Sequence, residues 1–401
     1  MDFTDSDAEA AYRATARDWL AANYAEHQAT QHDSDIARGK AWQARKTAGG
    51  YACITWPREW GGGGGTPIES VIFGQEEAQY AVDGGYFTIG LGMCVPTVMG
   101  FADDATKHRF VGPAVRGDEI WSQLFSEPAG GSDVAAIRTR AVRDGEDWVV
   151  NGQKVWTSGA HYSDFGIVLV RTNPDVPKHQ GLTMFWLDLK SPGIEIRPIH
   201  QMSGGSNFNE VWFSDVRIPD AQRLGPVDGG WKVALFTLMN ERLAVGAGGG
   251  VGPKDILKFA GQADGPDGPL LKDSAFRQKL ADWWVQSEGL RNTRMRTITA
   301  LSKGQAPGPE SSIGKIVAAN QLQEIGNSAV EAADQYGIIA DPALAPLNAA
   351  FHMATMSAPG LRIAGGTDEI LRNIIAERVL GLPGEIRVDK DQAFKDLPVG
   401  A

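Results

Sequence analysis

The sequence predicts a multidomain α+β fold in which a helical N-terminal region, a mostly antiparallel β region and a helical C-terminal region follow one another. Three observations support this fold class. The first region has apolar residues at helical spacing, the middle has short β-rich runs separated by turn signals, and the last has long helical stretches. The 401 residues suffice for two to three domains, and we place their boundaries at residues 1–118, 119–228 and 229–401.

The N-terminal region carries two helix signals. One helical stripe holds the apolar residues Ala8, Tyr12, Ala16, Trp19 and Leu20. Further on, Thr66, Pro67 and Glu69 supply an N-cap, a first-turn proline and a capping box, which predict a helix start. No strand pattern leads into Gly61–Gly65 and no G-K-[ST] follows, so we expect a flexible turn there rather than a phosphate loop.

The middle region reads as short strands joined by turns. The dipeptides Asp144-Gly145 and Asn151-Gly152 favour type I′ hairpins, because both central residues of such a turn need positive φ. Runs of strand length and β-rich composition lie at residues 148–150, 154–156, 165–170, 182–189, 194–199 and 210–213. The spaces between them are too short for helical crossovers, so a mostly antiparallel sheet is expected.

The C-terminal region returns to helical patterning. Candidate helices lie at residues 231–243, 276–302, 311–336 and 367–380. The last has clear limits, with Thr367 as N-cap and with Gly381 and Pro383 after its end.

Composition and charge exclude several classes of protein. With 38 Lys and Arg against 49 Asp and Glu, the net charge of −11 argues against nucleic acid as a partner. Two cysteines form no disulfide framework, and the seven histidines form no ligand-spaced cluster, so we expect no metal site. The N-terminus lacks the basic start and apolar run of a secretory signal. Residues 84–102 contain five glycines and a proline and read as a buried helical region rather than a membrane span. We therefore expect a cytoplasmic protein.

Three longer motifs carry a family resemblance. They are QLFSEPAGGSD at residues 123–133, NGQKVWTS at 151–158 and GGTDEILRN at 365–373. In order and spacing they closely resemble the acyl-CoA dehydrogenase family, over nearly the whole chain. The resemblance implies an N-terminal helical domain, a middle β domain and a C-terminal four-helix domain, with FAD and an acyl-CoA thioester bound between the last two.

The resemblance also implies roles for residues of the first motif. Leu124 and Ser126 would hydrogen-bond the pyrimidine end of the flavin, and Gly131 and Ser132 would approach the flavin phosphate or the substrate. Small residues suit such a place because they let backbone N–H groups come close to a ligand.

The other two motifs would complete the cofactor site. Trp156 would flank the flavin ring and Ser158 would lie beside its N5 edge; the alternative is that Trp156 only packs against the hairpin. Thr367 begins a helix whose N-terminus suits an electronegative ligand, and the resemblance places it at the cofactor with Glu369.

The expected reaction removes a proton from the carbon α to the thioester while a hydride leaves the β carbon, so a general base is needed. Much of the family carries this Glu immediately before a Gly-Thr pair, where this chain has Gly365. Other members carry it on an earlier helix before an Arg, which matches Glu241 and Arg242. Glu241 is therefore the expected base and Arg242 the substrate-orienting residue, while the backbone N–H of Gly365 would polarise the thioester carbonyl. The alternative for Glu241 is a structural ion pair or an exposed helix charge.

Two departures from the family pattern leave other functions open. The Arg and Phe of an R-x-x-F-G segment that reaches the FAD of a neighbouring subunit are replaced by Ala263 and Pro266. A Q-x-x-G-G element appears only as residues 334–338, DQYGI. The main expectation is an acyl-CoA dehydrogenase of lipid catabolism or β-oxidation, a homo-oligomer (dimer or tetramer) that passes electrons to an electron-transfer flavoprotein. The alternatives are a subunit of a hetero-oligomer with weak or no FAD binding, and a flavin oxidase or monooxygenase of the same fold.

Overall fold

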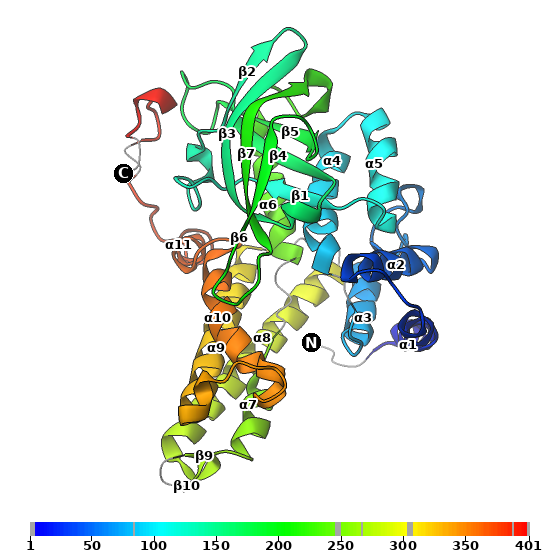
Figure 1. Cartoon of the computed structure of the whole chain (residues 1–401), viewed down its shortest axis with the longest axis vertical. Coiled ribbons are helices and arrows are strands. Elements are labelled where there is room, and N and C mark those ends of the chain that lie inside the picture. The colour runs from blue at the N-terminus through cyan, green and yellow to red at the C-terminus, as the bar shows by residue number, and fades with distance from the viewer. Residues whose placement is uncertain are drawn as a thin grey trace. The chain divides into compact units, whose positions relative to one another are not determined.

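The computed structural model describes residues 5–82, 85–244, 250–265, 268–302, 308–386 and 389–398, without the side chains of residues 241–244, 301, 302 and 311. It divides into two compact units. The sheet unit comprises Asp2–His200, Ser206–Ala244 and Ile386–Ala401, and the helical unit comprises Gln201–Gly205 and Val245–Glu385. The chain therefore contains the N-terminal helices, the middle sheet and the C-terminal helices that the sequence predicts (Figure 1).

The N-terminal helices of the sheet unit are α1 (Asp7–Ala29), α2 (Asp35–Ala48), α3 (Pro67–Glu77), α4 (Val95–Phe101) and α5 (Asp104–Arg116). Short turns of helix lie at η1 (Arg58–Trp60), η2 (Gly85–Phe87) and the π-helix η3 (Gly90–Cys94). The capping box before α3 is confirmed, because Thr66 Oγ1 accepts from the Glu69 N–H and Glu69 accepts from the Thr66 N–H.

The glycine run is a turn, but a closely packed one. A Cβ on Gly62 would lie 2.4 Å from the Trp56 carbonyl oxygen, and a Cβ on Gly63 would lie 2.4 Å from that of Gly50. The glycines are therefore needed for close approach of backbone segments, and the predicted turn is confirmed.

The segment of membrane-span length is a buried helical region over its described part. Within residues 85–102, η2, η3 and α4 follow one another, and Cys94, Val95 and Val98 have no exposed surface. Across the part of the chain that the structure describes, no helix combines the length and apolarity of a membrane span.

The sheet contains β1 (Trp121–Leu124), β2 (Arg140–Asp144), β3 (Asp147–Ser158), β4 (Phe165–Arg171), β5 (Leu182–Asp188), β6 (Ile194–Ile199), β7 (Phe208–Pro219) and β8 (Arg223–Leu224). Its order is β6-β7-β3-β2-β4-β5-β8, with β1 joined to β4. The strand pairs are antiparallel except β1 with β4 and a single residue pair of β2 with β4, so a mostly antiparallel sheet is confirmed. Three 3-10 turns, η4 (Val134–Ala136), η5 (Ala160–Tyr162) and η6 (Asp220–Gln222), connect the strands.

The two predicted type I′ turns are both wrong, in different ways. Asp144 pairs with Asp147, so the hairpin turn is Gly145-Glu146, and only Gly145 has positive φ (64°); glycine in the first position suits a type II′ turn. At Asn151-Gly152 there is no turn, and β3 runs through. Gly152 (φ 149°) lies at a register shift, where a Cβ would come 2.5 Å from Thr139 Oγ1.

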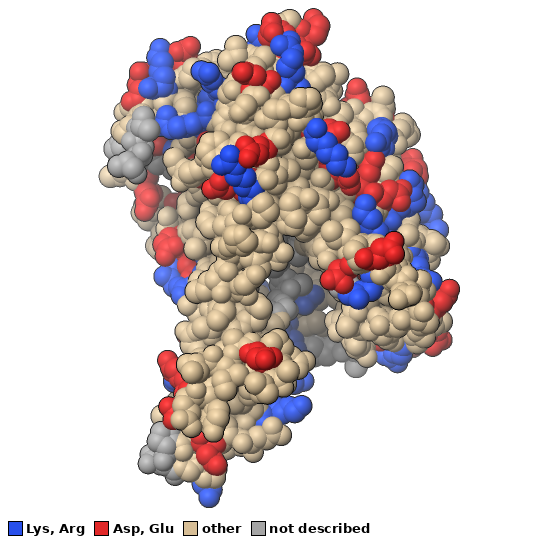
Figure 2. Space-filling model, viewed as in Figure 1, with Lys and Arg blue, Asp and Glu red and all other residues tan. Residues whose placement is uncertain are grey.

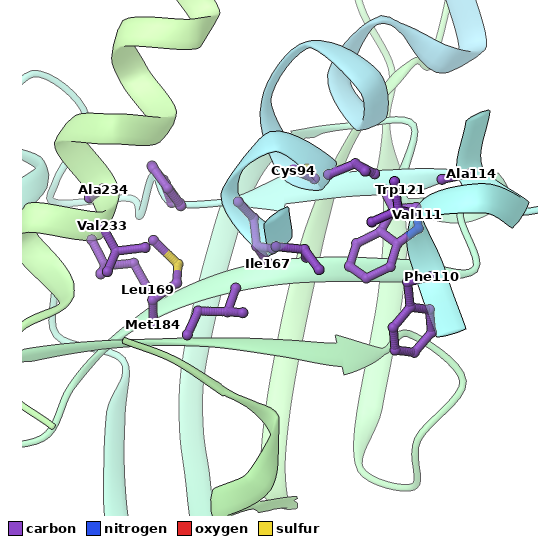
Figure 3. Packing of buried hydrophobic residues seen from close by; sticks show 14 of the residues in the cluster. Cys94, Phe110, Val111, Ala114, Trp121, Ile167, Leu169, Met184, Val233 and Ala234 are labelled. Carbon is purple, nitrogen blue, oxygen red and sulfur yellow. The ribbon is translucent and has the colours of Figure 1, made fainter. Parts of the chain in front are cut away.

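Both faces of the central strands are covered. On one face, Ile167 and Leu169 of β4 pack with Cys94, Val111 and Val233, which come from η3, α5 and α6 (Gly230–Ala244) (Figure 3). On the other face, Val168 and Val170 join a cluster with Leu124, Val150 and Phe185. This alternation with a period of two fixes the register of the strands and hence the positions of the motifs that they carry.

The helical unit contains α7 (Pro253–Ala260), α8 (Ser274–Ser302), α9 (Ser312–Ala332), α10 (Ala350–Ile363) and α11 (Asp368–Arg378). Its short elements are β9 (Asp264–Gly265), β10 (Gly268–Pro269), η7 (Leu270–Lys272), η8 (Pro309–Ser311), η9 (Asp334–Ile338) and η10 (Pro346–Ala349). The predicted helices are found as α6, α8, α9 and α11, whereas α7 and α10 were not predicted from the sequence. Ile256, Trp283, Ile325 and Phe351 contribute to the core of this unit.

A hydrogen-bonded carboxylate in η6, directly after β7, yields a test of pH dependence. Asp220 accepts hydrogen bonds from Arg223 and from Trp148 Nε1, and these lower the pKa of Asp220 from 3.8 to about 2. A carboxylate with a lowered pKa stabilises the fold above pH 4 and loses this effect as the pH falls through 2. We expect Asp220→Asn to cost about 1 to 2 kcal/mol at pH 7, and the cost to shrink below pH 4.

Thermal unfolding of the wild type and the variant at pH 7 and pH 3 measures this difference. Asp144→Asn serves as a control, because its ion pair with Arg217 is more than half exposed on both sides. A cost of Asp220→Asn that stayed constant with pH would contradict the assignment.

Candidate functional site

Two of the sequence motifs meet in the sheet unit through a buried lysine. Lys154 of β3 has no exposed surface, and its Nζ donates to Glu127 Oε1 at 2.8 Å and to the Phe125 carbonyl at 3.0 Å. One residue further on, the Val155 N–H donates to the Ser126 carbonyl at 2.9 Å. The strand that carries Trp156 and Ser158 is therefore fixed against the segment that carries Ser126.

The Glu127 carboxylate also holds the far end of this segment. It accepts the backbone N–H of Arg138 at 2.6 Å and that of Thr139 at 2.9 Å. Burial raises the pKa of Glu127, but the Lys154 charge and these hydrogen bonds more than offset it, so the pKa lies below its ordinary value. Residues 126–139, which we call the Ser-Glu-Pro loop, are thus closed around an ionised, fully hydrogen-bonded carboxylate.

The outer part of this loop is open to a ligand. Gly131 and Ser132 are exposed, and a Cβ on Gly131 would meet no atom within 4 Å. Ser126 is half-buried at the start of the loop. Leu124 is fully buried and its side chain lies in the core, so only its backbone is available for the hydrogen bond that the resemblance implies.

Trp156 has an unusual backbone for a strand residue. Its φ is 59°, in the left-handed region that a bulky side chain occupies only at a cost, and it lies within the register shift of β3 between Lys154 and Thr157. The side chain is 57% exposed, with an edge contact to Phe208 at 6.0 Å between ring centroids. The ring of Trp156 is therefore mostly exposed, with one edge contact to Phe208.

Ser158 borders a cavity of about 530 Å³ inside the sheet unit. Its lining combines aromatic and hydroxyl groups, among them Tyr86, Thr88, Tyr162 and Phe208. Tyr86 and Tyr162 meet edge to face at 5.3 Å, and burial together with the neighbouring Tyr86 raises the pKa of Tyr162. The volume lies within the range of small-molecule pockets.

Two side chains beside the expected ligand residues carry buried polar atoms without a partner among the described residues. These atoms are Gln123 Oε1 and Thr157 Oγ1. Buried polar atoms are normally satisfied, so they fit a site that a ligand completes. Both residues stand inside the sequence motifs, but neither could be predicted as a ligand residue, because a motif does not show which side chains lack partners.

In the helical unit, the third motif is held by a second buried carboxylate. Asp368 is 2% exposed, accepts from Arg362 Nε at 2.8 Å and from Asn320 at 3.2 Å, and Lys315 Nζ donates to the Gly366 carbonyl at 2.7 Å. Burial raises the pKa of Asp368, but the hydrogen bonds from Arg362 and Asn320 and the nearby positive charges lower it by more. The pKa of Asp368 therefore lies below its usual value. The loop that leads into α11 is therefore fixed.

The residues of this loop have distinct conformations. Gly365 and Gly366 both have left-handed backbones, with φ of 64° and 92°. The Thr367 hydroxyl caps α11 by accepting from the Ile370 N–H at 3.2 Å, and Glu369 is exposed in the first turn. A left-handed backbone at position 365 favours glycine over a residue with a side chain.

The expected base lies on α6. Glu241 and Arg242 fall in its last turn, but their side chains lie outside the described residues.

The residues that depart from the family pattern lie in the helical part of the chain. Ala263 packs against the core of the helical unit, and Pro266 lies outside the described residues. In η9, Gly337 is required by a close approach, since a Cβ there would lie 2.3 Å from the Val330 carbonyl oxygen. Among the described residues, no three His, Cys, Asp or Glu side chains are grouped as metal ligands would be.

The chain combines N-terminal helices, a middle sheet and C-terminal helices. In the sheet unit, the Ser-Glu-Pro loop exposes small residues and β3 exposes the ring of Trp156. Models of the acyl-CoA dehydrogenase N-terminal, middle and C-terminal domains match residues 6–118, 122–216 and 228–380. Acyl-CoA dehydrogenase IpdE1 of Mycobacterium tuberculosis is 34% identical over 393 residues, which cover 94% of this chain and 98% of that protein. The chain belongs to the acyl-CoA dehydrogenase family, and so to the oxidoreductases that act on the CH–CH group of acyl-CoA.

Two further comparisons agree with this family. Acyl-CoA dehydrogenase FadE34 of M. tuberculosis is 37% identical over 330 residues, which cover 82% of this chain but 44% of that protein, so this chain spans less than half of its length. A chain in the crystal structure of the ChsE4-ChsE5 complex from M. tuberculosis superposes with a TM-score of 0.77 at 26% identity, over 96% of this chain and 100% of that one.

The buried pair leads to a stability prediction. Lys154→Met leaves Glu127 buried without its charged partner, which should cost about 3 to 5 kcal/mol of unfolding free energy. Lys190→Met is the matched control, because the Lys190 side chain is 74% exposed in its pair with Asp164 and should change stability by about 0.5 kcal/mol or less. Urea unfolding of the two variants measures the difference, and equal losses would contradict the role of the pair.

Proposed function

We propose that the protein is an FAD-dependent acyl-CoA dehydrogenase that converts an acyl-CoA thioester to its trans-2-enoyl form and passes electrons to an electron-transfer flavoprotein. The observation that carries this proposal is the fixed Ser-Glu-Pro loop beside the left-handed, exposed Trp156. When bound, FAD supplies the acceptor for the hydride that leaves the β carbon.

The residues that hold FAD come from all three motifs. The Leu124 backbone and Ser126 bind the pyrimidine end, Gly131 and Ser132 offer N–H and hydroxyl groups to phosphate or substrate, and Trp156 and Ser158 flank the ring. Thr367 and Glu369 bind the cofactor from the N-terminus of α11. The open space at Gly131 and the unpartnered Gln123 and Thr157 atoms support this assignment.

Glu241 takes the proton from the α carbon. A carboxylate in an apolar pocket without water has a raised pKa, which brings it toward the working pH and makes it an effective base. Arg242 orients the thioester, and the Gly365 N–H polarises its carbonyl. The left-handed backbone of Gly365 supports a base carried by α6 rather than by the loop before α11.

We assign the cavity beside Ser158 to the acyl group. Its aromatic walls suit an apolar ligand, and its position next to Ser158 brings that ligand to the flavin edge that the family resemblance implies. The identity of the acyl group follows from the shape of this pocket and not from any motif.

The assembly is expected to be a homo-oligomer, in keeping with the family, and the compartment to be the cytoplasm. A hetero-oligomer is the alternative, supported by the ChsE4-ChsE5 complex as a structural relative and by the replaced residues Ala263 and Pro266.

The alternative functions are less well supported. The intact Ser-Glu-Pro loop argues against a chain without FAD, and a monooxygenase has no need of Glu241. On the face in Figure 2, Lys and Arg are interspersed with Asp and Glu, without the basic patch of a nucleic-acid surface.

The reaction is tested by flavin bleaching. The purified protein should be yellow and lose its flavin absorbance when an acyl-CoA substrate is added without oxygen. Glu241→Gln should keep the flavin and lose bleaching, because the α proton has no acceptor. Glu146→Gln, in the exposed hairpin turn, is the matched control. A Glu241→Gln variant with full bleaching would remove the proposed base, and a wild type that stays colourless with added FAD would favour the hetero-oligomer.

A second prediction separates the roles of Trp156. Trp156→Gly removes an exposed ring and relieves the left-handed backbone, so the stability of the apoprotein should stay within about 1 kcal/mol of the wild type or rise. The affinity for FAD should fall, and Trp156→Phe should restore part of it. Thermal unfolding and titration with FAD measure the two effects. A large loss of stability with unchanged affinity would assign Trp156 to packing alone.

A further inference from the structure

The last described segment of the chain, residues 389–398, folds back onto the sheet unit, and we call it the C-terminal strap (Figure 1, red). It runs antiparallel to residues 174–177. The Phe394 N–H donates to the Val176 carbonyl at 2.9 Å, the Lys395 N–H donates to that of Pro174 at 3.0 Å, and Ala393 pairs with Pro177. The strap therefore adds a short strand-like contact and the 3-10 turn η11 (Phe394–Asp396) to a surface loop.

Its first contact with the rest of the unit is an aromatic ring over a buried arginine. Phe394 is 5% exposed and its ring centre lies 3.8 Å from the Arg171 guanidinium carbon, while Arg138 lies 5.2 Å from the same ring. Arg171 is itself 3% exposed and donates to the carbonyls of Ala135 and Lys178. The strap thus covers the arginine that holds the backbone of the Ser-Glu-Pro loop at Ala135.

Its second contact is an ion pair shared with that loop. Lys178 Nζ donates to Asp389 of the strap and, at 2.6 Å, to Asp133. Burial lowers the pKa of Lys178, but the hydrogen bonds to the two carboxylates outweigh it and raise the pKa. Asp133 follows Ser132 directly, so this pair fixes the outer end of the segment assigned to phosphate or substrate.

We propose that the C-terminal strap is a positioning element for the Ser-Glu-Pro loop, and that it sets the affinity of the chain for FAD. Phe394 and Asp389 act through Arg171 and Lys178, and neither residue belongs to the cofactor site itself. Glu127 fixes the loop from within the sheet unit, and the strap fixes the same loop at Asp133 and Ala135. The effect on FAD rests on the function proposed above, whereas the effect on loop order does not.

The test compares Phe394→Ala, Asp389→Asn and Phe394→Tyr with a matched control, Lys395→Ala. Lys395 lies in the strap, but its pair with Asp175 is more than half exposed on both sides and does not reach the Ser-Glu-Pro loop. For each protein we would measure the dissociation constant for FAD by flavin fluorescence, the melting temperature, and amide exchange at Arg138 and Thr139 in the apoprotein.

Phe394→Ala and Asp389→Asn should each weaken FAD binding by roughly tenfold and speed amide exchange in the loop, with little change in the melting temperature. Phe394→Tyr keeps an aromatic ring over Arg171 and should retain the wild-type affinity for FAD and the wild-type exchange rates. Lys395→Ala should retain both as well. Unchanged exchange in both Phe394→Ala and Asp389→Asn would overturn the proposal, as would equal loss in Lys395→Ala. If the wild type binds no FAD, the proposed function fails, and the exchange rates alone decide the role of the strap.

Discussion

A lysine and a glutamate buried together hold the candidate site in place. Lys154 and Glu127 come from different motifs, and their contact fixes the strand of Trp156 against the loop of Ser126. Removing two charges from water is costly, and this cost is recovered only when every polar atom finds a partner. Here Glu127 accepts from one ammonium and two backbone N–H groups, so the loop must adopt the observed course for the charge to be tolerated.

The helical unit also fixes a loop through a buried carboxylate, although Oδ1 of this one, Asp368, has no partner among the described residues. Asp368 is buried, paired with Arg362 and bonded to Asn320, and the loop before it carries two left-handed glycines. In both units one acidic residue of the motif is buried and structural, and in the Ser-Glu-Pro loop the small residues Gly131 and Ser132 are exposed. This division explains why motifs of this kind combine acidic residues with glycine and serine: the acid fixes the backbone, and the small residues leave room for a cofactor.

The sequence was sufficient for the fold class and the main elements, because hydrophobic periodicity and helix caps act locally. Prediction from the sequence failed where contacts between residues far apart in the chain determine the local structure. Asn151-Gly152 is a strong turn signal, yet Thr139 lies against Gly152 and the strand continues as a bulge. The motifs pointed to Ser126, Trp156 and Ser158, but not to Glu127 with Lys154, or to Phe394 over Arg171, since these pairs join residues 27 and 223 positions apart.

The most direct test of the account is a double-mutant cycle on the affinity for FAD, with Glu127→Gln, Lys154→Met and the two combined. If the buried pair builds the flavin surface, each single change should weaken FAD binding by roughly tenfold or more. The double variant leaves no unpaired charge, so it should bind FAD at least as tightly as the single variant with the lower affinity. Single variants that bind FAD as tightly as the wild type, or losses that simply add, would contradict the account.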